Sequence, residues 1–162
     1  MFGGTIVLHN SFLYMHQILE IMTREKVTGF PVVPTIVAML LRMKDLKKYD
    51  FSSIKGIITS AAPISPSLLR KASEIFGDVY IMTYGTSETA LGGCQLHPED
   101  VALEGPKSKR LTSVGKSMMG MNVRVVDDDG NDIPWGSDKP GEVVVSGPTV
   151  GIGYWKKPEA TD

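Results

Sequence analysis

The sequence of 162 residues is long enough for about one domain, and its 42% hydrophobic and 22% charged content lies near the averages of globular proteins. Its 17 basic and 18 acidic residues nearly cancel, which argues against a nucleic-acid partner because such binders carry a clear basic excess. The single cysteine, Cys94, excludes an internal disulfide and suits a reducing compartment, so a cytoplasmic protein is expected. The longest apolar stretch, residues 30–41, is shorter than the ~20 residues of a membrane span, so none is expected.

The first part of the chain alternates strand-like and helix-like patterns. Residues 5–8 are β-branched and apolar and form a short strand candidate. Apolar residues at helical spacing predict a helix over residues 15–22. An extended segment is predicted over residues 27–33, and Pro34 can open the next helix, which continues to Met43.

The same alternation continues toward the middle of the chain. A strand is predicted over residues 54–60, and the helix that follows is marked by Ser65 as N-cap, Pro66 in the first turn and Gly77 at its end. Another strand is predicted over residues 79–83. Strands that alternate with helices in this way indicate βαβ units, so the fold class is α/β with a parallel sheet.

The second part of the chain has a different pattern. Residues 98–110 are polar and are predicted to form a loop, and residues 123–126 and 142–145 are β-rich. Asp127 to Gly130 has the composition of a turn, and no further helix is predicted before Pro158. These features predict a small antiparallel, β-barrel-like subdomain.

The change of pattern predicts two subdomains. Residues 1–97 would form the α/β subdomain, and residues 98–162 would form the antiparallel β subdomain.

Chemistry-bearing residues follow the strand predicted over residues 79–83. Tyr84 offers a flat face for a nucleobase, and Gly85 permits close approach of the backbone. Thr86 and Ser87 can donate hydrogen bonds to phosphate oxygens, and Glu88 is an oxygen ligand that suits Mg²⁺. In open α/β sheets ligands bind beyond the carboxyl ends of strands. The alternative interpretation is a strand end followed by a polar turn.

A second strand end supports the first interpretation. The strand over residues 54–60 leads into Ser60-Ala61-Ala62-Pro63, a small-residue shelf against which a flat ring can lie, with φ fixed at the proline. Two neighbouring strands would then end in this shelf and in the loop with Tyr84, and the pair could hold adenine between them.

Here the sequence resembles a known family. Thr83-Tyr84-Gly85-Thr86-Ser87-Glu88 resembles the Y-G-x-T-E motif of the adenylate-forming superfamily of acyl-CoA synthetases, luciferases and peptide-synthetase adenylation domains, and Ser60-Ala61-Ala62-Pro63 resembles its adenine-binding G-A-x-P loop. Further matches follow in family order: K-V-T at 26–28, V-P-T at 33–35, D-F-S-S-I-K at 50–55, G-E-V at 141–143, G-Y-W at 153–155 and P-E-A-T at 158–161.

The resemblance implies roles for individual residues. Ser87, which replaces the family's usual threonine and keeps its hydroxyl, and Glu88 would be catalytic, and Glu88 would hold Mg²⁺. Nucleotide-binding residues would be Ser60, Ala61, Ala62, Pro63, Thr83, Tyr84, Gly85, Thr86 and Ser87.

The implied parent enzyme uses ATP to turn a fatty or aromatic carboxylate into an acyl-adenylate, with release of pyrophosphate. Coenzyme A then takes the acyl group and AMP leaves. One alternative is a peptide-synthetase adenylation domain, although Ala61-Ala62-Pro63 favours a synthetase because adenylation domains usually read Gly-Gly-Glu there. Another is a stand-alone, non-catalytic nucleotide-binding module.

Some family elements are missing from the sequence. The resemblance places a Gly/Ser/Thr-rich phosphate loop upstream and a Thr-Gly-Asp element downstream, and neither occurs in these residues. We therefore expect a chain that is catalytically incomplete on its own and that self-associates through apolar surfaces left uncovered.

Overall fold

The computed structural model describes residues 3–10, 14–100 and 102–161, in two compact units, Met1–Ile81 and Met82–Asp162. The boundary between the units falls inside the strand β3 (Tyr80–Tyr84). The predicted division after residue 97 was based on a change of sequence pattern, whereas these units reflect packing. The predicted subdomain boundary therefore stays a prediction.

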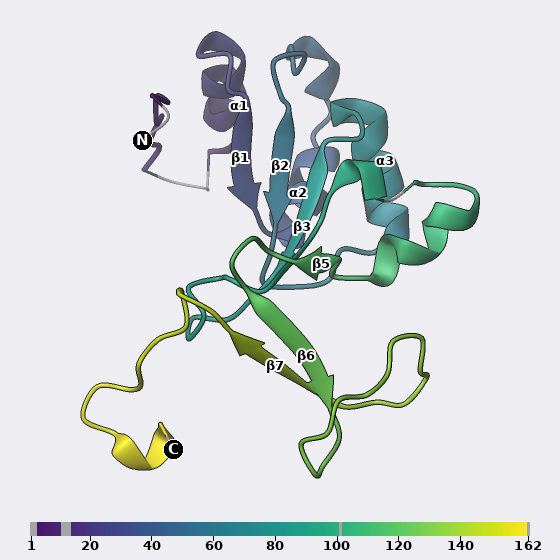
Figure 1. Ribbon diagram of the computed structural model, residues 1–162. Coiled ribbons are helices and arrows are strands. Elements are labelled where there is room, and N and C mark those ends of the chain that lie inside the picture. The colour runs from purple at the N-terminus through teal and green to yellow at the C-terminus, as the bar shows by residue number, and fades with distance from the viewer. Residues whose placement is uncertain (1–2, 11–13, 101, 162) are drawn as a thin grey trace. The chain divides into compact units, whose positions relative to one another are not determined.

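In its described residues, 3–10 and 14–81, the first unit combines α-helices with parallel strands (Figure 1). In chain order its elements are α1 (Met15–Arg24), β1 (Gly29–Val32), α2 (Pro34–Leu41), the 3-10 helix η1 (Leu46–Lys48), β2 (Gly56–Thr59) and α3 (Pro66–Phe76). β1 and β2 run parallel with Gly29 opposite Gly56, and the N–H of Ile57 donates to the carbonyl of Val79, just before β3, at 2.8 Å. The predicted α/β class is confirmed.

Local signals account for helix α3. The Oγ of Ser65 accepts a hydrogen bond from the N–H of Leu68 at 3.2 Å, as an N-cap does. Pro66 occupies the first turn, where its missing N–H costs nothing, and Gly77 ends the helix with φ +79°. The helix buries one face: Leu69, Ala72 and Phe76. The cap at Ser65, the proline of the first turn and the terminal glycine were each predicted from neighbours in sequence.

One predicted element is wrong. Residues 5–8 form no strand, and the side chains of Ile6 and Leu8 are 82% and 85% exposed. A β-branched, apolar segment forms a strand only where a partner strand takes its backbone hydrogen bonds, and residues 5–8 take part in no strand pairing.

The second unit is largely antiparallel (Figure 1). The end of β3 pairs with β4 (Cys94–Leu96), and β4 pairs with β5 (Lys116–Ser117). β6 (Asn122–Val126) and β7 (Glu142–Ser146) form a two-stranded antiparallel sheet, which confirms the predicted small antiparallel part. The remaining elements are short 3-10 helices: η2 (Pro98–Asp100), η3 (Pro106–Thr112) and η4 (Pro158–Ala160). η2 lies in the segment predicted to be a loop, residues 98–110, and η3 begins in it and ends two residues beyond.

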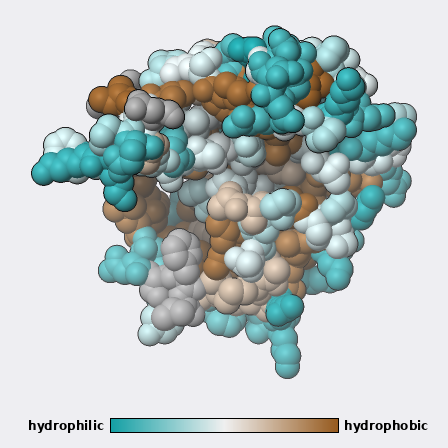
Figure 2. Space-filling view, turned by 90° about the horizontal axis from the view of Figure 1, so that it is seen from below, coloured by the Kyte–Doolittle hydropathy of each residue, from teal (hydrophilic) through white to brown (hydrophobic). Residues whose placement is uncertain are grey.

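Apolar side chains form the core and also reach the surface. Leu19, Val37 and Ile57 are the largest fully buried side chains, whereas the face shown in Figure 2 has apolar groups among polar ones. The expected self-association through such surfaces stays a prediction. Within residues 3–10, 14–100 and 102–161, no helix has the length and apolar character needed to cross a bilayer.

Candidate functional site

The loop that follows β3 is closed by its own hydrogen bonds. The N–H of Thr86 donates to the Oγ1 of Thr89 at 3.1 Å, and that hydroxyl donates back to the carbonyl of Thr86 at 3.2 Å. Thr89 is buried, whereas the side chains of Thr86, Ser87 and Glu88 are exposed. The buried threonine therefore fixes the loop from inside and leaves two hydroxyls and a carboxylate facing outward.

The backbone of this loop is strained. Ala90 and Leu91 have φ +48° and +62°, in the left-handed region that non-glycine residues avoid. Gly85 lies against the backbone of Leu91 so closely that a Cβ at position 85 would meet its carbonyl carbon at 2.5 Å. Such strain persists only where the surroundings enforce it, and it is concentrated at functional sites.

A second segment far along the chain contacts Glu88. The hydroxyl of Tyr154 donates to the Oε1 of Glu88 at 2.7 Å, and the N–H of Gly151 donates to the carbonyl of Glu88 at 2.6 Å. The N–H of Tyr154 donates in turn to the Oγ1 of Thr161 at 2.9 Å. Two hydrogen bonds thus hold residues 151–154 against the loop, and the third fixes Tyr154 to Thr161 within its own segment.

Between these two segments lies a cavity of about 420 Å³. Its walls combine a hydroxyl, a carboxylate and glycines that expose the backbone, a set that suits a phosphate-bearing ligand. The lining residues are Ser87, Glu88, Gly151, Ile152, Gly153, Tyr154, Ala160 and Thr161.

Hydrogen bonding sets the charge of this cavity. The Tyr154 hydroxyl, followed by the backbone of Glu88 and the Thr86 side chain, holds the pKa of the Glu88 carboxyl below its usual value. The same bond, together with the negative charge of Glu88, raises the pKa of Tyr154. At neutral pH the cavity therefore contains an ionised carboxylate and a neutral phenol that donates to it.

The chemistry of these groups fits one divalent cation shared with a ligand. No three His, Cys, Asp or Glu side chains converge on one point in the described parts of the chain. A single carboxylate is nevertheless enough for Mg²⁺ when phosphate oxygens and water supply the other ligands. The site could thus hold a cation only together with a phosphate.

The shelf of small residues belongs to the first unit. Ser60 follows the last residue of β2 and is half-buried, and the next three residues are exposed. Ala61 has φ +67°, so this loop also contains a strained non-glycine residue. The predicted position of adenine between the shelf and Tyr84 stays a prediction.

The structure places every predicted residue after or at the end of the expected strand. Thr83 and Tyr84 end β3, and the Thr83 hydroxyl is buried with no hydrogen-bond partner among the described residues. The roles of Gly151, Tyr154 and Thr161 were not predicted. Tyr154 and Thr161 lie in the G-Y-W and P-E-A-T matches and Gly151 lies in neither, and nothing in those motifs shows which side chain they meet.

Comparison with known proteins gives a family match. The model of the family described as "AMP-binding enzyme" matches residues 1–155. The medium/long-chain-fatty-acid–CoA ligase FadD8 of Mycobacterium tuberculosis is 31% identical over 145 residues, which are 90% of this chain and 24% of that protein.

Solved structures agree with this match. The amide bond synthetase McbA from Marinactinospora thermotolerans superposes with a TM-score of 0.78 and 33% identity, over 90% of this chain and 29% of that chain. The anthranilate CoA ligase AuaEII in complex with anthranoyl-AMP superposes with a TM-score of 0.75 and 25% identity, over 90% of this chain and 26% of that one. The chain thus spans less than a third of each of these relatives.

Proposed function

Because the chain belongs to the AMP-binding enzyme family, we propose that it supplies the adenylate-binding part of an acyl-CoA synthetase. The observation that carries the proposal is the 420 Å³ cavity in which the Ser87 hydroxyl and the ionised Glu88 carboxylate lie opposite exposed glycine backbone. These groups match the phosphate of an adenylate and the cation that accompanies it.

The nucleotide would be held by both strand-end loops. In this proposal one face of adenine lies on the shelf of Ser60 to Pro63 and the other on the ring of Tyr84. The hydroxyls of Thr86 and Ser87 donate to the α-phosphate, and Gly85 keeps the loop close to the strand end. Thr83 supports the loop from within β3, where its own hydroxyl is buried.

Glu88 is the proposed ligand for Mg²⁺. Its carboxylate keeps acceptor capacity beyond the bond from Tyr154, since an ionised carboxylate has about four lone-pair sites. Bound there, the cation would neutralise charge on the phosphates. The residues of the chain would orient the nucleotide and hold the α-phosphate in place.

The proposed reaction has two balanced steps. A carboxylate oxygen of the substrate bonds to the α-phosphorus of ATP, and the bond to the pyrophosphate oxygen breaks with its electron pair. The thiolate sulfur of coenzyme A then bonds to the acyl carbon, and AMP leaves with the electrons of the mixed anhydride. The chemistry of the first step needs positioning and charge neutralisation more than acid–base catalysis.

The relatives support a CoA ligase over a peptide-synthetase adenylation domain, since FadD8 and AuaEII are both described as CoA ligases. An amine is the second candidate acceptor, because McbA is described as an amide bond synthetase. Product analysis by mass spectrometry, with ATP, a carboxylate and either coenzyme A or an amine, distinguishes the two acceptors in the enzyme that contains this chain.

Nucleotide binding tests the proposal directly. AMP is titrated into the ¹⁵N-labelled chain, and we expect amide signals of residues 60–63 and 84–88 to shift in a saturable way. Tyr84→Ala, which removes the proposed adenine contact, should weaken the binding, whereas Tyr14→Ala in the first unit serves as the matched control. A Kd of about 1 mM corresponds to a binding free energy of about −4 kcal/mol, and about 10 mM AMP would then nearly saturate the site. The proposal is contradicted if this concentration shifts no signal in these loops.

A further inference from the structure

We propose that Tyr154 is the positioning residue of the Glu88 carboxylate. Its hydroxyl holds one carboxylate oxygen, so that a cation in the cavity would meet the carboxylate in a fixed place. The inference rests on the proposed function for its ligand, but the contact itself is within the chain. It joins residues 66 positions apart through a 2.7 Å hydrogen bond.

The first step of the argument is that the Tyr154 backbone is itself held. Its N–H donates to the Oγ1 of Thr161 at 2.9 Å, and that hydroxyl donates to the carbonyl of Lys157 at 3.0 Å. Gly153 has φ +143° and lies against Thr161 so closely that a Cβ would clash with its Cγ2. The phenol therefore extends from a segment with few backbone alternatives.

The second step is that the backbone of Glu88 is held by the same segment. The N–H of Gly151 donates to its carbonyl at 2.6 Å. With the main chain fixed, the freedom left is that of an exposed glutamate side chain, which has three rotatable bonds and many accessible rotamers. The Tyr154 hydroxyl at Oε1, acting beside the Glu88 backbone and the Thr86 side chain, restricts that freedom.

The third step concerns the kind of donor. Tyr154 is neutral, so it orients the carboxylate and leaves its negative charge in place. A lysine or arginine at this distance would instead cancel that charge. The neighbouring Lys156 lies 5.8 Å from the centre of the Trp155 ring. Glu88 forms no ion pair with any residue in the described parts of the chain. A neutral donor and an unpaired carboxylate are what a cation site of this kind requires.

The positioning can be measured without any ligand. Tyr154→Phe removes only the hydroxyl, and Tyr49→Phe is the matched control, because Tyr49 also has a hydroxyl near a partner, 3.1 Å from the Nδ1 of His16. With ¹³C-labelled glutamate, we expect the Glu88 side chain to show one dominant rotamer in the wild type and averaged couplings in Tyr154→Phe. Tyr49→Phe should match the wild type.

Cation binding gives the second measurement. Mn²⁺ is titrated against the chain in the presence of AMP and followed by water-proton relaxation. Tyr154→Phe should weaken the apparent Mn²⁺ affinity about tenfold and change AMP affinity in metal-free buffer much less, because the lost hydroxyl donates to Glu88. A purely structural defect would lower both affinities together. Thr161→Val, which frees the Tyr154 backbone, should cause a smaller loss of Mn²⁺ affinity. It replaces Tyr154→Phe as the test variant if Tyr154→Phe does not fold.

The two proposals fail in different ways. If the wild type binds no AMP, the proposed function fails, and the Glu88 rotamer measurement by itself decides whether Tyr154 orients the carboxylate. If the wild type binds AMP and Mn²⁺ but Tyr154→Phe and Tyr49→Phe are indistinguishable in both measurements, the role of Tyr154 is overturned and the proposed function stands.

Discussion

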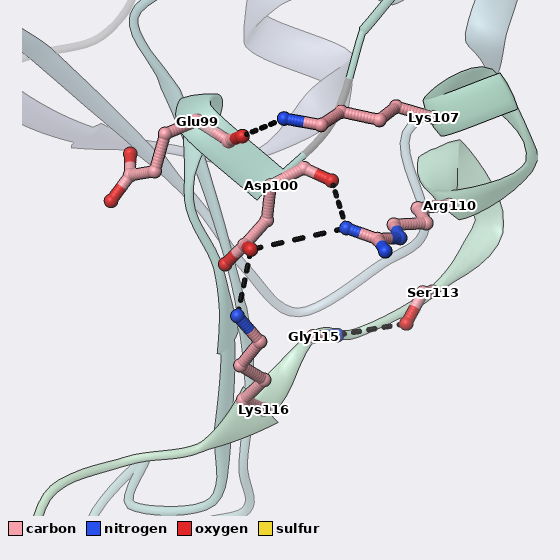
Figure 3. A network of polar contacts seen from close by, with 7 residues as sticks. All are labelled: Glu99, Asp100, Lys107, Arg110, Ser113, Gly115 and Lys116. Atoms are coloured by element: carbon pink, nitrogen blue, oxygen red, sulfur yellow. Dashed lines mark hydrogen bonds and ion pairs between the residues drawn. The ribbon is translucent and has the colours of Figure 1, made fainter.

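The Nζ of Lys116 lies 2.7 Å from the Oδ1 of Asp100, and this contact joins β5 to η2 (Figure 3). Arg110 reaches the same oxygen at 4.0 Å and donates to the Asp100 carbonyl at 3.0 Å, and Lys107 donates to the carbonyl of Glu99 at 2.8 Å. Between β4 and β5, residues 97–100 and 102–115 take part in no strand pairing. Cationic side chains of η3 and β5 instead attach η2 to these two elements.

Lys116→Met should raise the pKa of Asp100. The hydrogen bond from Lys116 is the main cause that holds the pKa of this carboxyl below its usual value. A carboxyl with a lowered folded-state pKa adds stability above its unfolded pKa of about 4, and loses that contribution as the pH falls through the folded value. The stability difference between variant and wild type should therefore shrink between pH 7 and pH 2. Carboxyl ¹³C titration measures the pKa of Asp100, and urea unfolding measures the stability difference. Lys139→Met is the control. An unchanged pKa of Asp100 in Lys116→Met contradicts the prediction.

Ala61→Gly should stabilise the chain. A non-glycine residue in the left-handed region costs about 1–2 kcal/mol, whereas the greater freedom of glycine in the unfolded chain costs roughly 0.5–1 kcal/mol. The expected net gain in the free energy of unfolding is therefore about 0.5–1 kcal/mol, because Ala61 has φ +67°. Ala62→Gly, one position further and without positive φ, should instead lose about 0.5–1 kcal/mol. Equal losses from both variants in urea unfolding would refute the strain at position 61.

Gly85→Ala should destabilise the second unit. The new methyl group would lie 2.5 Å from the backbone of Leu91, which cannot move aside as a flexible side chain can. Overpacking of this kind costs about 1–3 kcal/mol, and it should also displace the amide signals of residues 85–91. Gly4→Ala is the control, since a Cβ there meets no atom within 4 Å. If both variants unfold at the same urea concentration, the close approach does not exist in solution.

Tyr80→Phe should leave stability unchanged or raise it by about 1 kcal/mol, because the buried hydroxyl of Tyr80 has no hydrogen-bond partner among the described residues. Burial raises the pKa of Tyr80 well above its usual value. Folding therefore favours the neutral phenol. The contribution of this preference to the free energy of unfolding is complete below the unfolded pKa of about 10 and is lost as the pH rises beyond it. The advantage of Tyr80→Phe over the wild type should accordingly grow between pH 8 and pH 11 in urea unfolding. Tyr14→Phe, at an exposed position, should show no such growth.

Local chemistry determined the elements that the sequence predicts well. Helix α3 begins at Ser65 and ends at Gly77 because the groups that satisfy its ends lie within three or four residues of them. The strands that end at Thr59 and Tyr84 lead directly into the small-residue shelf and into residues 85–88, an order that the chain itself fixes. The order of these motifs along the chain was enough to identify the family.

Tertiary structure decided the features that depend on distant partners. Residues 5–8 have the composition of a strand but pair with nothing, and the two-residue strand β5 exists only through its register with β4. Gly85 meets the backbone of Leu91, a neighbour that composition cannot reveal. Above all, the hydroxyl of Tyr154 reaches Glu88 across 66 positions because folding brings their segments together. The sequence predicted which groups would bind an adenylate, and only folding determined which distant side chain contacts the Glu88 carboxylate.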